Sequence, residues 1–483
     1  MKLSFWGAAQ QVTGSMYLLE LEDGYRVLID CGADMERPKA KDDEQKAPEP
    51  KSTTGFFPFE VSSINVVLLT HAHIDHSGNL PMLYREGYEG QILGTESTGA
   101  LTALLLKDSA MLNQKKLNAL GSGKRRKNLK RQDEKLRNVS RDLFFERQVH
   151  ETMENYVPLA FNRKFKISDS ASITFIPAGH LLGAAHIVME VFENGIKKSI
   201  CFSGDIGRKN YPLLTDPMPV PQVDYLICES TYGHRFHTDK QTPEAALADV
   251  IQRTCIDIPG RLIIPTFSVG RTQALLYSLN KLYNDFNFEP IKVFSDSALG
   301  MESTKVYQKH VRMLNQEARE FNEDNESLFD FQNLQYIESE QGSRMISTHS
   351  EPCIIISSSG MIQGGRVEQH VAANISNPYA TILIIGYCAE GTLGWRLMNG
   401  QKTLRIGKTE EQVLCNVERI DVFSGHADQT GLLDFVKQQD PAKLKQIFLI
   451  HGELAGMNTF KTLLETHDYQ NIEMPAKGQV YDL

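Results

Sequence analysis

The segment 69–78, LTHAHIDHSG, places three histidines and an aspartate within six residues. Four such ligands exceed what one tetrahedral zinc ion takes from so short a span. His71 and His73 are two residues apart, so in an extended segment they face the same side and can hold one ion. Asp75 and His76 follow at once and can face a second ion. The spacing therefore predicts part of a two-metal site, and nitrogen and oxygen donors without thiolate suit zinc, iron or manganese.

The other ligands of such a site have to come from elsewhere in the chain. Short apolar runs that end abruptly in polar or glycine-rich residues recur: VVLLT, SITFIPA, SICFS, YLICE, LIIPTFS, IKVFS, CIIISSS, TILIIGY, IDVFS and IFLI. These runs predict strands buried on both faces with helices between them. Ligands of buried α/β sheets collect at the carboxyl ends of strands. The histidines and carboxylates found at such ends supply the missing ligands and predict one composite site: His180, Asp205, His426 and His451.

The order of these runs also indicates a domain organisation. The chain opens with KLSFWGA, SMYLLEL and YRVLIDCG, which predict a β-meander. From about 236 to 400 the alternation of strand and helix patterns is regular and histidine is sparse, and ligand-type motifs resume at SGHAD. We therefore expect a host domain made from residues 1–235 and 401–483, with an α/β domain inserted at 236–400.

Net charge narrows the choice of partners. The chain has 60 acidic and 51 basic residues, a net charge of −9, so nucleic acid can bind only through a local basic groove. The conspicuous basic run is GSGKRRKNLKRQ at 121–132, within a predicted helical region that spans about 98–156. This run is either a solvated helix face or a phosphate-contacting patch. The polar segment 36–55 predicts a mobile loop.

Composition also bears on the compartment. No run approaches the roughly 20 apolar residues of a membrane helix, so we expect no membrane association. The N-terminal MKLSFWGAAQQVTGS lacks the long apolar core and cleavage site of a signal peptide. The seven cysteines are scattered and form no C-x-x-C pair, which favours reduced thiols. We expect a cytoplasmic protein.

Taken together, the motifs resemble a known family. HAHIDHSG, GHLLGA and FSGDIG resemble the metallo-β-lactamase superfamily of binuclear hydrolases. CESTYG, SGHAD and LIHGE resemble the three extra motifs of its β-CASP branch, and PTFSVGRTQ, SSSGMIQGGR and GYCAEGTLG resemble that branch's inserted domain. The chain is similar to prokaryotic β-CASP ribonucleases and to the endonuclease subunit of the cleavage and polyadenylation specificity factor. The resemblance implies an α/β fold, a metallo-β-lactamase αββα sandwich with an inserted α/β β-CASP domain.

The resemblance also implies a role for each candidate residue. It implies two divalent metal ions, for which zinc is the favoured choice. One ion would be held by His71, His73 and His180, the other by Asp75, His76 and His451, and Asp205 would bridge them. Asp30, in LIDCG, would orient the ligand histidines from outside the metal shell.

The chemistry implied by the resemblance is hydrolysis of RNA. Two ions share and activate a hydroxide, and His426, steadied by Glu229, protonates the leaving group. The histidine at 451 favours single-stranded RNA over DNA as substrate, and an endonuclease is favoured over a 5′–3′ exonuclease. Small residues and arginines of the inserted domain are candidate contacts to substrate phosphate, with a tight turn and a structural arginine as the alternative: Arg271, Ser358, Ser359, Gly360, Gly365 and Arg366.

Two rival functions stay open at the level of sequence. One is a binuclear-metal hydrolase of a small ester, thioester or phosphodiester. The other is a non-catalytic scaffold of RNA processing, although such proteins lose metal ligands and every expected ligand position is filled here. A homodimer is also left open.

Overall fold

The computed structural model describes residues 1–35, 56–122, 140, 142–286, 288–407 and 409–483. The chain folds into two compact units. Unit 1 consists of Met1–Gly207, Pro217–Phe236 and His426–Leu483, and unit 2 of Arg208–Asp216 and His237–Gly425. The domain boundaries at 236 and 400 stay a prediction. The segment 36–55 and residues 123–132 of the basic run lie outside the described residues.

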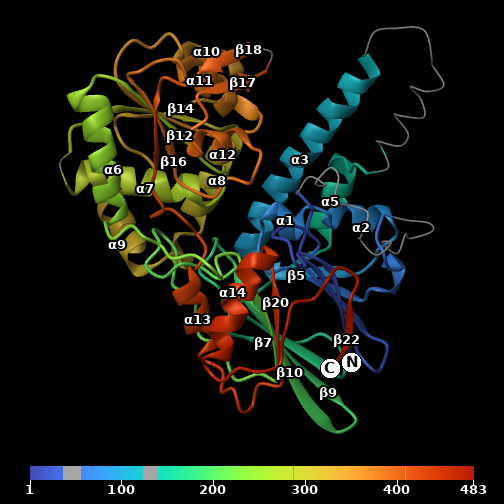
Figure 1. The fold of residues 1–483 in the computed structure, drawn as a ribbon. Coiled ribbons are helices and arrows are strands. Elements are labelled where there is room, and N and C mark those ends of the chain that lie inside the picture. Colours follow the sequence, from blue (N-terminus) through green and yellow to red (C-terminus); the bar gives the residue numbers. More distant parts are fainter. Residues whose placement is uncertain (36–55, 123–139, 141, 287, 408) are drawn as a thin grey trace. The chain divides into compact units, whose positions relative to one another are not determined.

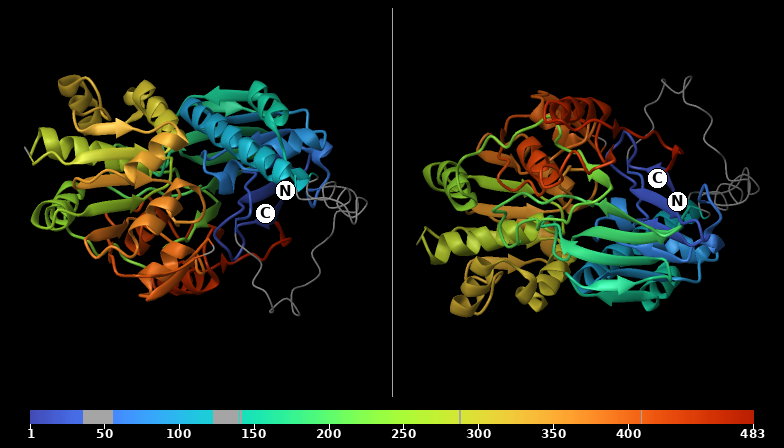
Figure 2. Two further views of the ribbon diagram at one scale, coloured as in Figure 1. Left: turned by 90° about the horizontal axis from the view of Figure 1, so that it is seen from above. Right: turned by 90° about the horizontal axis from the view of Figure 1, so that it is seen from below.

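The first sheet of unit 1 has the strand order β22-β1-β2-β3-β4-β5-β6. Strands β1 to β3 form the predicted antiparallel meander, and β3 to β6 run parallel. Strand β22 pairs with β1, so the two chain ends lie side by side in every view (Figures 1 and 2). The strands are β1 (Lys2–Gly7), β2 (Met16–Glu20), β3 (Arg26–Ile29), β4 (Val66–Leu68), β5 (Gln91–Thr95), β6 (Tyr156–Leu159) and β22 (Val480–Asp482).

The second sheet of unit 1 has the order β21-β20-β11-β10-β9-β8-β7. Strands β8, β10, β11 and β20 point the same way, because β9 is antiparallel to both β8 and β10, while β10, β11 and β20 are parallel. Their carboxyl ends therefore lie at one edge. The strands are β7 (Lys164–Lys166), β8 (Ala171–Pro177), β9 (Ala185–Glu193), β10 (Ile196–Phe202), β11 (Tyr225–Glu229), β20 (Gln446–Ile450) and β21 (Ile472–Glu473).

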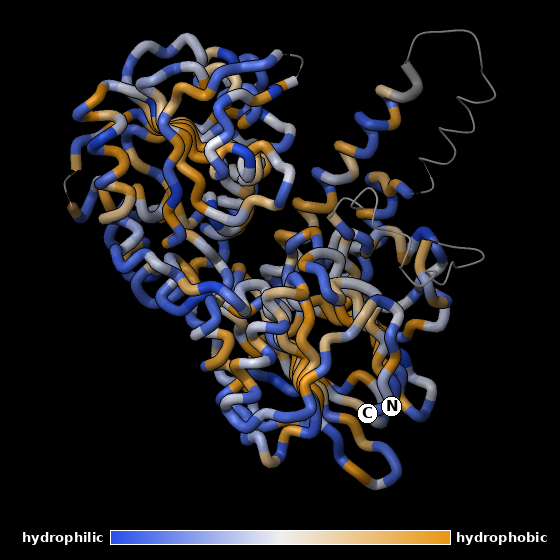
Figure 3. The backbone as a smooth tube through the Cα atoms, in the orientation of Figure 1, coloured by the Kyte–Doolittle hydropathy of each residue, from blue (hydrophilic) through white to orange (hydrophobic). Residues whose placement is uncertain are grey.

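Alternation along the strands builds the four layers of unit 1. Leu19, Ile29 and Leu68 of the first sheet share a core with Phe175 and Phe202 of the second. Their neighbours along each strand point outward and pack under helices, because successive side chains of a strand face opposite sides. The order helix, sheet, sheet, helix confirms the predicted αββα sandwich, and Figure 3 shows hydrophobic residues concentrated in the strands. Helices α2 (Leu80–Arg85), α3 (Glu96–Ser122) and α5 (Glu146–Glu154) cover the first sheet, and α13 (Gln429–Val436) and α14 (Leu454–Glu465) the second.

Unit 2 is an α/β domain around a parallel sheet of order β14-β13-β15-β12-β16-β19. Its strands are β12 (Arg261–Pro265), β13 (Lys292–Asp296), β14 (Leu334–Tyr336), β15 (Cys353–Ser357), β16 (Ala380–Ile384) and β19 (Asn416–Arg419), beside the pair β17 (Thr403–Ile406) and β18 (Thr409–Gln412). Its helices are α6 (Pro243–Ile251), α7 (Arg271–Asn284), α8 (Ala298–Lys309), α9 (Gln316–Asn325), α10 (Glu340–Ile346), α11 (Gly365–Asn374) and α12 (Leu393–Met398).

One predicted strand is wrong. The run IDVFS, 420–424, is a turn, in which the Ser424 N–H donates to the Asp421 carbonyl. Val422 and Phe423 are buried, so their apolar character reflects burial of a connecting segment and not a sheet position. Within the described part of the chain, no helix is both long and apolar enough to cross a bilayer.

Candidate metal centre

The segment HAHIDH turns from strand β4 into the short helix α1 (Ile74–Ser77). His71 and His73 lie on the loop, and Asp75 and His76 lie in the helical turn. The segment LIDCG, residues 28–32, fixes the loop through a hydrogen bond that the Cys31 N–H donates to the His76 carbonyl. A Cβ at Gly32 would stand 1.7 Å from the Asp75 carbonyl oxygen, so only glycine fits there. The turn thereby presents all four side chains of HAHIDH to the same edge of the fold.

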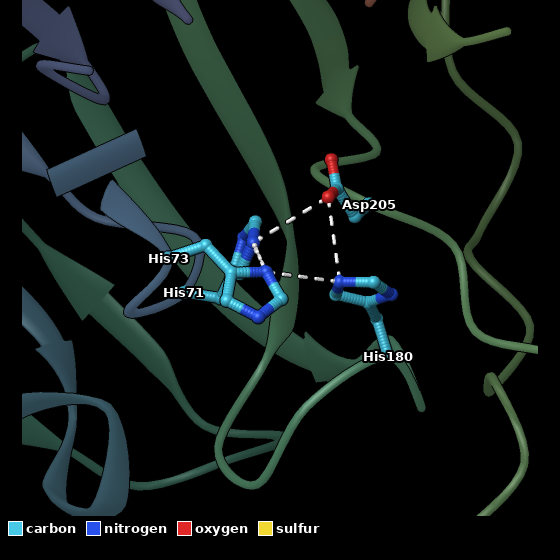
Figure 4. A group of neighbouring side chains, drawn as sticks. All are labelled: His71, His73, His180 and Asp205. Carbon is cyan, nitrogen blue, oxygen red and sulfur yellow. Dashed lines mark hydrogen bonds and ion pairs between the residues drawn. The ribbon is translucent and has the colours of Figure 1, made fainter. Parts of the chain in front are cut away.

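A first group of donors converges from three loops of unit 1 (Figure 4). His73 Nδ1 lies 3.1 Å from His71 Nε2 and 3.2 Å from His180 Nε2. Asp205 Oδ2 lies 3.5 Å from His71 Nε2 and 3.4 Å from His180 Nε2. Four donors bound tetrahedrally at about 2.1 Å from a zinc ion lie about 3.4 Å from one another. The spacing of this group therefore matches a metal coordination shell.

A second group lies beside the first. His451 Nε2 is 3.3 Å from His76 Nε2 and 3.5 Å from Asp75 Oδ2. The other oxygen of Asp205, Oδ1, is 3.2 Å from His76 Nε2 and 3.6 Å from His451 Nε2. One carboxylate thus offers an oxygen to each group, which is the position of a bridging ligand.

Asp205 gives a direct test of whether a cation fits this site. Its Oδ1 is buried and, among the described residues, accepts no hydrogen bond, although two imidazole nitrogens stand close to it. A buried carboxylate oxygen without a donor is costly unless a cation compensates it. The donor set of imidazole and carboxylate is the one that zinc and similar ions use. The residues therefore fit two divalent ions.

The charges of the site agree with this fit. Burial lowers the pKa of His73 to about 4 and that of His71 well below its usual value, so both are neutral with a lone pair to give at pH 7. Burial opposes protonation of His76 too, but the carboxylates of Asp205 and Asp30 outweigh it and hold the pKa of His76 well above its usual value. The carboxylates thus draw positive charge into the site, which a bound cation would supply while releasing the proton.

Asp30 lies just outside the two groups and contacts their histidines. Its Oδ2 lies 2.7 Å from His76 Nδ1 and accepts from Thr70 Oγ1 at 2.8 Å. Thr70 Oγ1 in turn lies 3.1 Å from His71 Nδ1. Because Nδ1 of each imidazole is engaged behind the site, Nε2 of both His71 and His76 is turned toward the other donors.

Glu229 and His426 form a pair at the same place. His426 Nδ1 lies 3.2 Å from Glu229 Oε1, and its Nε2 lies 3.9 Å from Asp205 Oδ2. Glu229 is fully buried, and its carboxylate also accepts the N–H groups of Ile206 and Thr231. The histidine thus has a fixed carboxylate beside Nδ1, and its Nε2 faces the two groups of candidate metal ligands.

The candidate phosphate contacts all lie in unit 2, and the two arginines among them differ. Arg366 is engaged internally, donating to Asp296 Oδ1 at 2.7 Å and to the carbonyls of Ile337 and Glu338. Arg271 has no acidic partner among the described residues. Its guanidinium lies 4.8 Å from the Phe267 ring centroid. The internal contacts of Arg366 support the structural alternative for that residue.

The small residues among these candidates lie between the end of β15 and the start of α11. Ser358 Oγ lies 3.0 Å from Ser297 Oγ, and Ser359 Oγ is bonded to the backbone of Gln363. Gly365 has a φ of +74° and opens helix α11. A Cβ at Gly360 would lie 3.0 Å from the Phe267 ring. These contacts describe a compact turn.

Sequence reasoning missed two hydroxyl residues, Thr70 and Thr231, which bond the candidate ligands His71 and His451. Each sits beside or close to a predicted site residue in the chain. That proximity was the available signal, because a short side chain near a ligand in a tight turn is within reach of a neighbouring imidazole. A buried cluster around Asp296 in unit 2 was also missed.

The αββα fold, with two adjoining His and Asp groups at the carboxyl ends of its strands, defines a metal-dependent hydrolase of the metallo-β-lactamase type. Family models match in three segments: the metallo-beta-lactamase superfamily at residues 10–240, the Beta-Casp domain at 272–397, and the Zn-dependent metallo-hydrolase RNA specificity domain at 410–475. The chain belongs to the β-CASP branch of the metallo-β-lactamase superfamily.

Curated relatives extend over nearly the whole chain. A ribonuclease of Thermus thermophilus is 30% identical over 94% of this chain and 93% of its own length. The transcription termination factor FttA of Methanocaldococcus jannaschii is 29% identical over 98% of this chain and 71% of its own length. Integrator complex subunit 11 of Danio rerio is 26% identical over 99% of this chain and 73% of its own length.

Proposed function

We propose that this chain is a metal-dependent ribonuclease that hydrolyses phosphodiester bonds of single-stranded RNA, with His426 as the general acid. The observation that carries the proposal is the Glu229–His426 pair, whose second imidazole nitrogen lies 3.9 Å from the carboxylate shared by both donor groups. The name of the Thermus thermophilus relative and the match to an RNA specificity domain support RNA as the substrate.

The first group, His71, His73 and His180, would hold one ion, and Asp75, His76 and His451 the other, with Asp205 between them. Zinc is the favoured ion. Divalent ions bound there would activate water near neutral pH and offset the negative charge that builds on a phosphate oxygen. Asp30 would keep the imidazoles of His76 and His71 turned toward the ions, the latter through Thr70.

The leaving oxygen needs a proton, and His426 is placed to give one from Nε2. Its Nδ1 lies 3.2 Å from Glu229 Oε1, and this buried carboxylate would hold the ring with Nε2 directed at the leaving oxygen. The two backbone N–H groups on Glu229 keep that carboxylate in place without neutralising it. A site that only bound metal ions would not require a histidine–carboxylate pair beside its ligands.

We also propose endonucleolytic rather than 5′–3′ exonucleolytic cleavage, and phosphate contact by Arg271 in an inserted domain at 236–400. The seven cysteines are all free and buried, which supports a reducing, cytoplasmic setting. A homodimer stays a prediction.

The test uses the purified full chain. Bound metal is measured, and end-labelled single-stranded RNA, single-stranded DNA and a chromogenic phosphodiester are offered to the wild type and to Asp75→Ala and His426→Ala. His426→Ala should lose roughly 100- to 10,000-fold in RNA cleavage and keep its metal, because it removes only the proton donor. Asp75→Ala should lose both metal and activity.

The matched control is His150→Ala, which removes an exposed histidine of α5 that forms an ion pair with Glu154. It should leave cleavage unchanged. Products from RNA labelled at the 5′ or 3′ end would separate internal cuts from stepwise removal. A wild type that binds no metal and cuts none of the substrates contradicts the proposal, and cleavage of the small phosphodiester alone would favour the small-substrate alternative.

A further inference from the structure

Thr231 lies between Glu229 and His451 and forms hydrogen bonds with both. Its backbone N–H donates to Glu229 Oε2 at 3.2 Å. Its side-chain Oγ1 lies 2.9 Å from His451 Nδ1 and donates to the His451 carbonyl at 3.1 Å. Through one residue, therefore, the carboxylate behind the general acid is connected to a candidate metal ligand.

The hydroxyl of Thr231 carries a single hydrogen, and the direction in which it is donated sets the tautomer of the neutral His451 ring. Because that hydrogen is given to the His451 carbonyl, Oγ1 can only accept a hydrogen bond from Nδ1. Nδ1 of His451 then carries the proton in the neutral ring. Nε2 is left with its lone pair, 3.3 Å from His76 Nε2 and 3.5 Å from Asp75 Oδ2.

The backbone of His451 needs such support. The residue has a φ of +49°, a left-handed conformation that side-chain-bearing residues seldom adopt. Its N–H donates to the Ala8 carbonyl at 2.8 Å, while its own carbonyl accepts from Thr231 Oγ1 and from the Ser230 N–H. The parallel pairing of β11 with β20 ends at Glu229 and Ile450, so these bonds continue the connection where the strands stop.

We infer that Thr231 is a positioning residue that fixes the ring orientation and the tautomer of His451, and thereby sets the affinity of the second ion. This inference rests on the proposed two-metal function. It distinguishes the two imidazoles of the second group: His76 is held from behind by the carboxylate of Asp30, and His451 by a neutral hydroxyl. Partners that orient a ligand histidine typically contribute 10- to 100-fold to metal affinity.

The test measures zinc affinity in Thr231→Val, which keeps the shape of the side chain and removes the hydroxyl, and in Thr231→Ser, which keeps the hydroxyl. The backbone bond from residue 231 to Glu229 is available to both variants. Zinc content is followed by titration against a competing chelator, with inorganic zinc as the probe. Thr102→Val is the control, because Thr102 Oγ1 is buried and makes no hydrogen bond among the described residues.

In Thr231→Val, one of two zinc ions should bind 10- to 100-fold more weakly, while the other keeps wild-type affinity. Thr231→Ser should stay within about threefold of the wild type, and Thr102→Val should match it. Wild-type affinity for both ions in Thr231→Val would overturn the inference, as would equal loss of both ions in the Val and Ser variants. A wild type that binds two zinc ions but cuts no RNA would refute the proposed function and leave this measurement valid.

Discussion

Asp205 in unit 1 and Asp296 in unit 2 are both buried aspartates at or just beyond the carboxyl end of a strand, and both have histidines around them. Asp296 is fully satisfied by its own unit. Its Oδ1 accepts from Arg366, and its Oδ2 accepts from Ser343 Oγ at 2.5 Å and lies 2.6 Å from His370 Nε2. Asp205 Oδ1 accepts no hydrogen bond within the described residues, although the imidazoles of His76 and His451 lie 3.2 and 3.6 Å from it.

The difference teaches what separates a structural cluster from a binding site. Both regions contain the residue types of a metal site, so residue type does not decide between them. Around Asp296 each carboxylate oxygen accepts a hydrogen bond, and a guanidinium balances the negative charge of the carboxylate. Around Asp205 carboxylate oxygens and imidazole nitrogens converge on common points, the carboxylates raise the pKa of His76, and Oδ1 still accepts no hydrogen bond among the described residues, so the cluster favours a bound cation. Ligand atoms that converge around an unsatisfied carboxylate oxygen, and not histidine content, mark the candidate site in unit 1.

The largest effect should come from Asp205→Asn. An amide keeps one neutral oxygen and replaces the other by an NH2 group, so it could not offer a charged oxygen to each donor group; we expect both ions to bind more weakly and RNA cleavage to fall by roughly 1,000-fold or more. Metal content and cleavage rate measure this directly. Retention of two ions at wild-type affinity would show that Asp205 does not bridge them.

Asp296→Asn should act on stability instead. The change leaves the Arg366 guanidinium without its anion, and breaking a buried pair in this way costs about 3 kcal/mol in free energy of unfolding. The chain has two tryptophans, Trp6 in unit 1 and Trp395 in unit 2. Urea unfolding of a Trp6→Phe background therefore reports on unit 2 through Trp395. Metal content should not change, and a loss of metal in this variant would break the contrast.

His186 limits the comparison, because its Nε2 is also buried without a partner in the described part of the chain. Its Nδ1 lies 2.5 Å from the Ser203 carbonyl, and its ring packs against Phe435. Burial, opposed by the bond to Ser203, lowers the pKa of His186 to about 4. It belongs to neither donor group. A single buried nitrogen without a partner therefore also occurs in a histidine of the hydrophobic core. A metal site requires, in addition, that several ligand atoms converge on one point.

The sign of the pH dependence follows from that lowered pKa. Between about pH 6.5 and 4 the unfolded chain binds a proton that folded His186 does not. The free energy of unfolding therefore has its full value above pH 6.5 and falls as the pH drops toward 4. The full loss is on the order of 3 kcal/mol. His186→Asn keeps a donor near the position of Nδ1 and cannot titrate. Its unfolding free energy, followed through Trp6, should fall less steeply than that of the wild type over this range, and equal slopes would contradict the assignment.

The smallest effect separates the two arginines of unit 2. If Arg271 contacts one substrate phosphate as proposed, Arg271→Ala should raise KM for RNA about fivefold and reduce the slope of log affinity against log salt concentration by about one. Arg366→Ala should instead lower the stability of unit 2, since it strips Asp296 of a donor. Binding measured between about 50 and 200 mM salt, together with urea unfolding, tests both. An unchanged salt slope in Arg271→Ala would remove that residue from the substrate contacts.

Much of the site followed from sequence because its members stand directly after apolar runs. The carboxyl ends of aligned strands meet at one edge, so His180, Asp205 and His451 converge with HAHIDH whatever their separation in the chain. The αββα layering followed for the same reason. IDVFS failed because a buried connecting segment is as apolar as a strand, and periodicity alone does not separate the two.

The contacts of hydroxyl groups and of Arg366 could not be predicted. Whether an arginine meets an internal carboxylate or stays available depends on tertiary packing, and Asp296 lies 70 residues before Arg366. The same holds for Thr231, whose partner His451 is 220 residues away. These pairings are set by strand order in each sheet, which the one-dimensional pattern does not contain.

The most direct test of the central claim is a zinc titration of the chelator-treated full chain with RNA cleavage recorded at each point. We predict that two ions bind per chain, that cleavage is absent without metal, and that it reaches its full rate only as the second ion binds. Cleavage that persists at full rate in the metal-free chain, or a folded chain that binds no zinc, iron or manganese, would contradict the account.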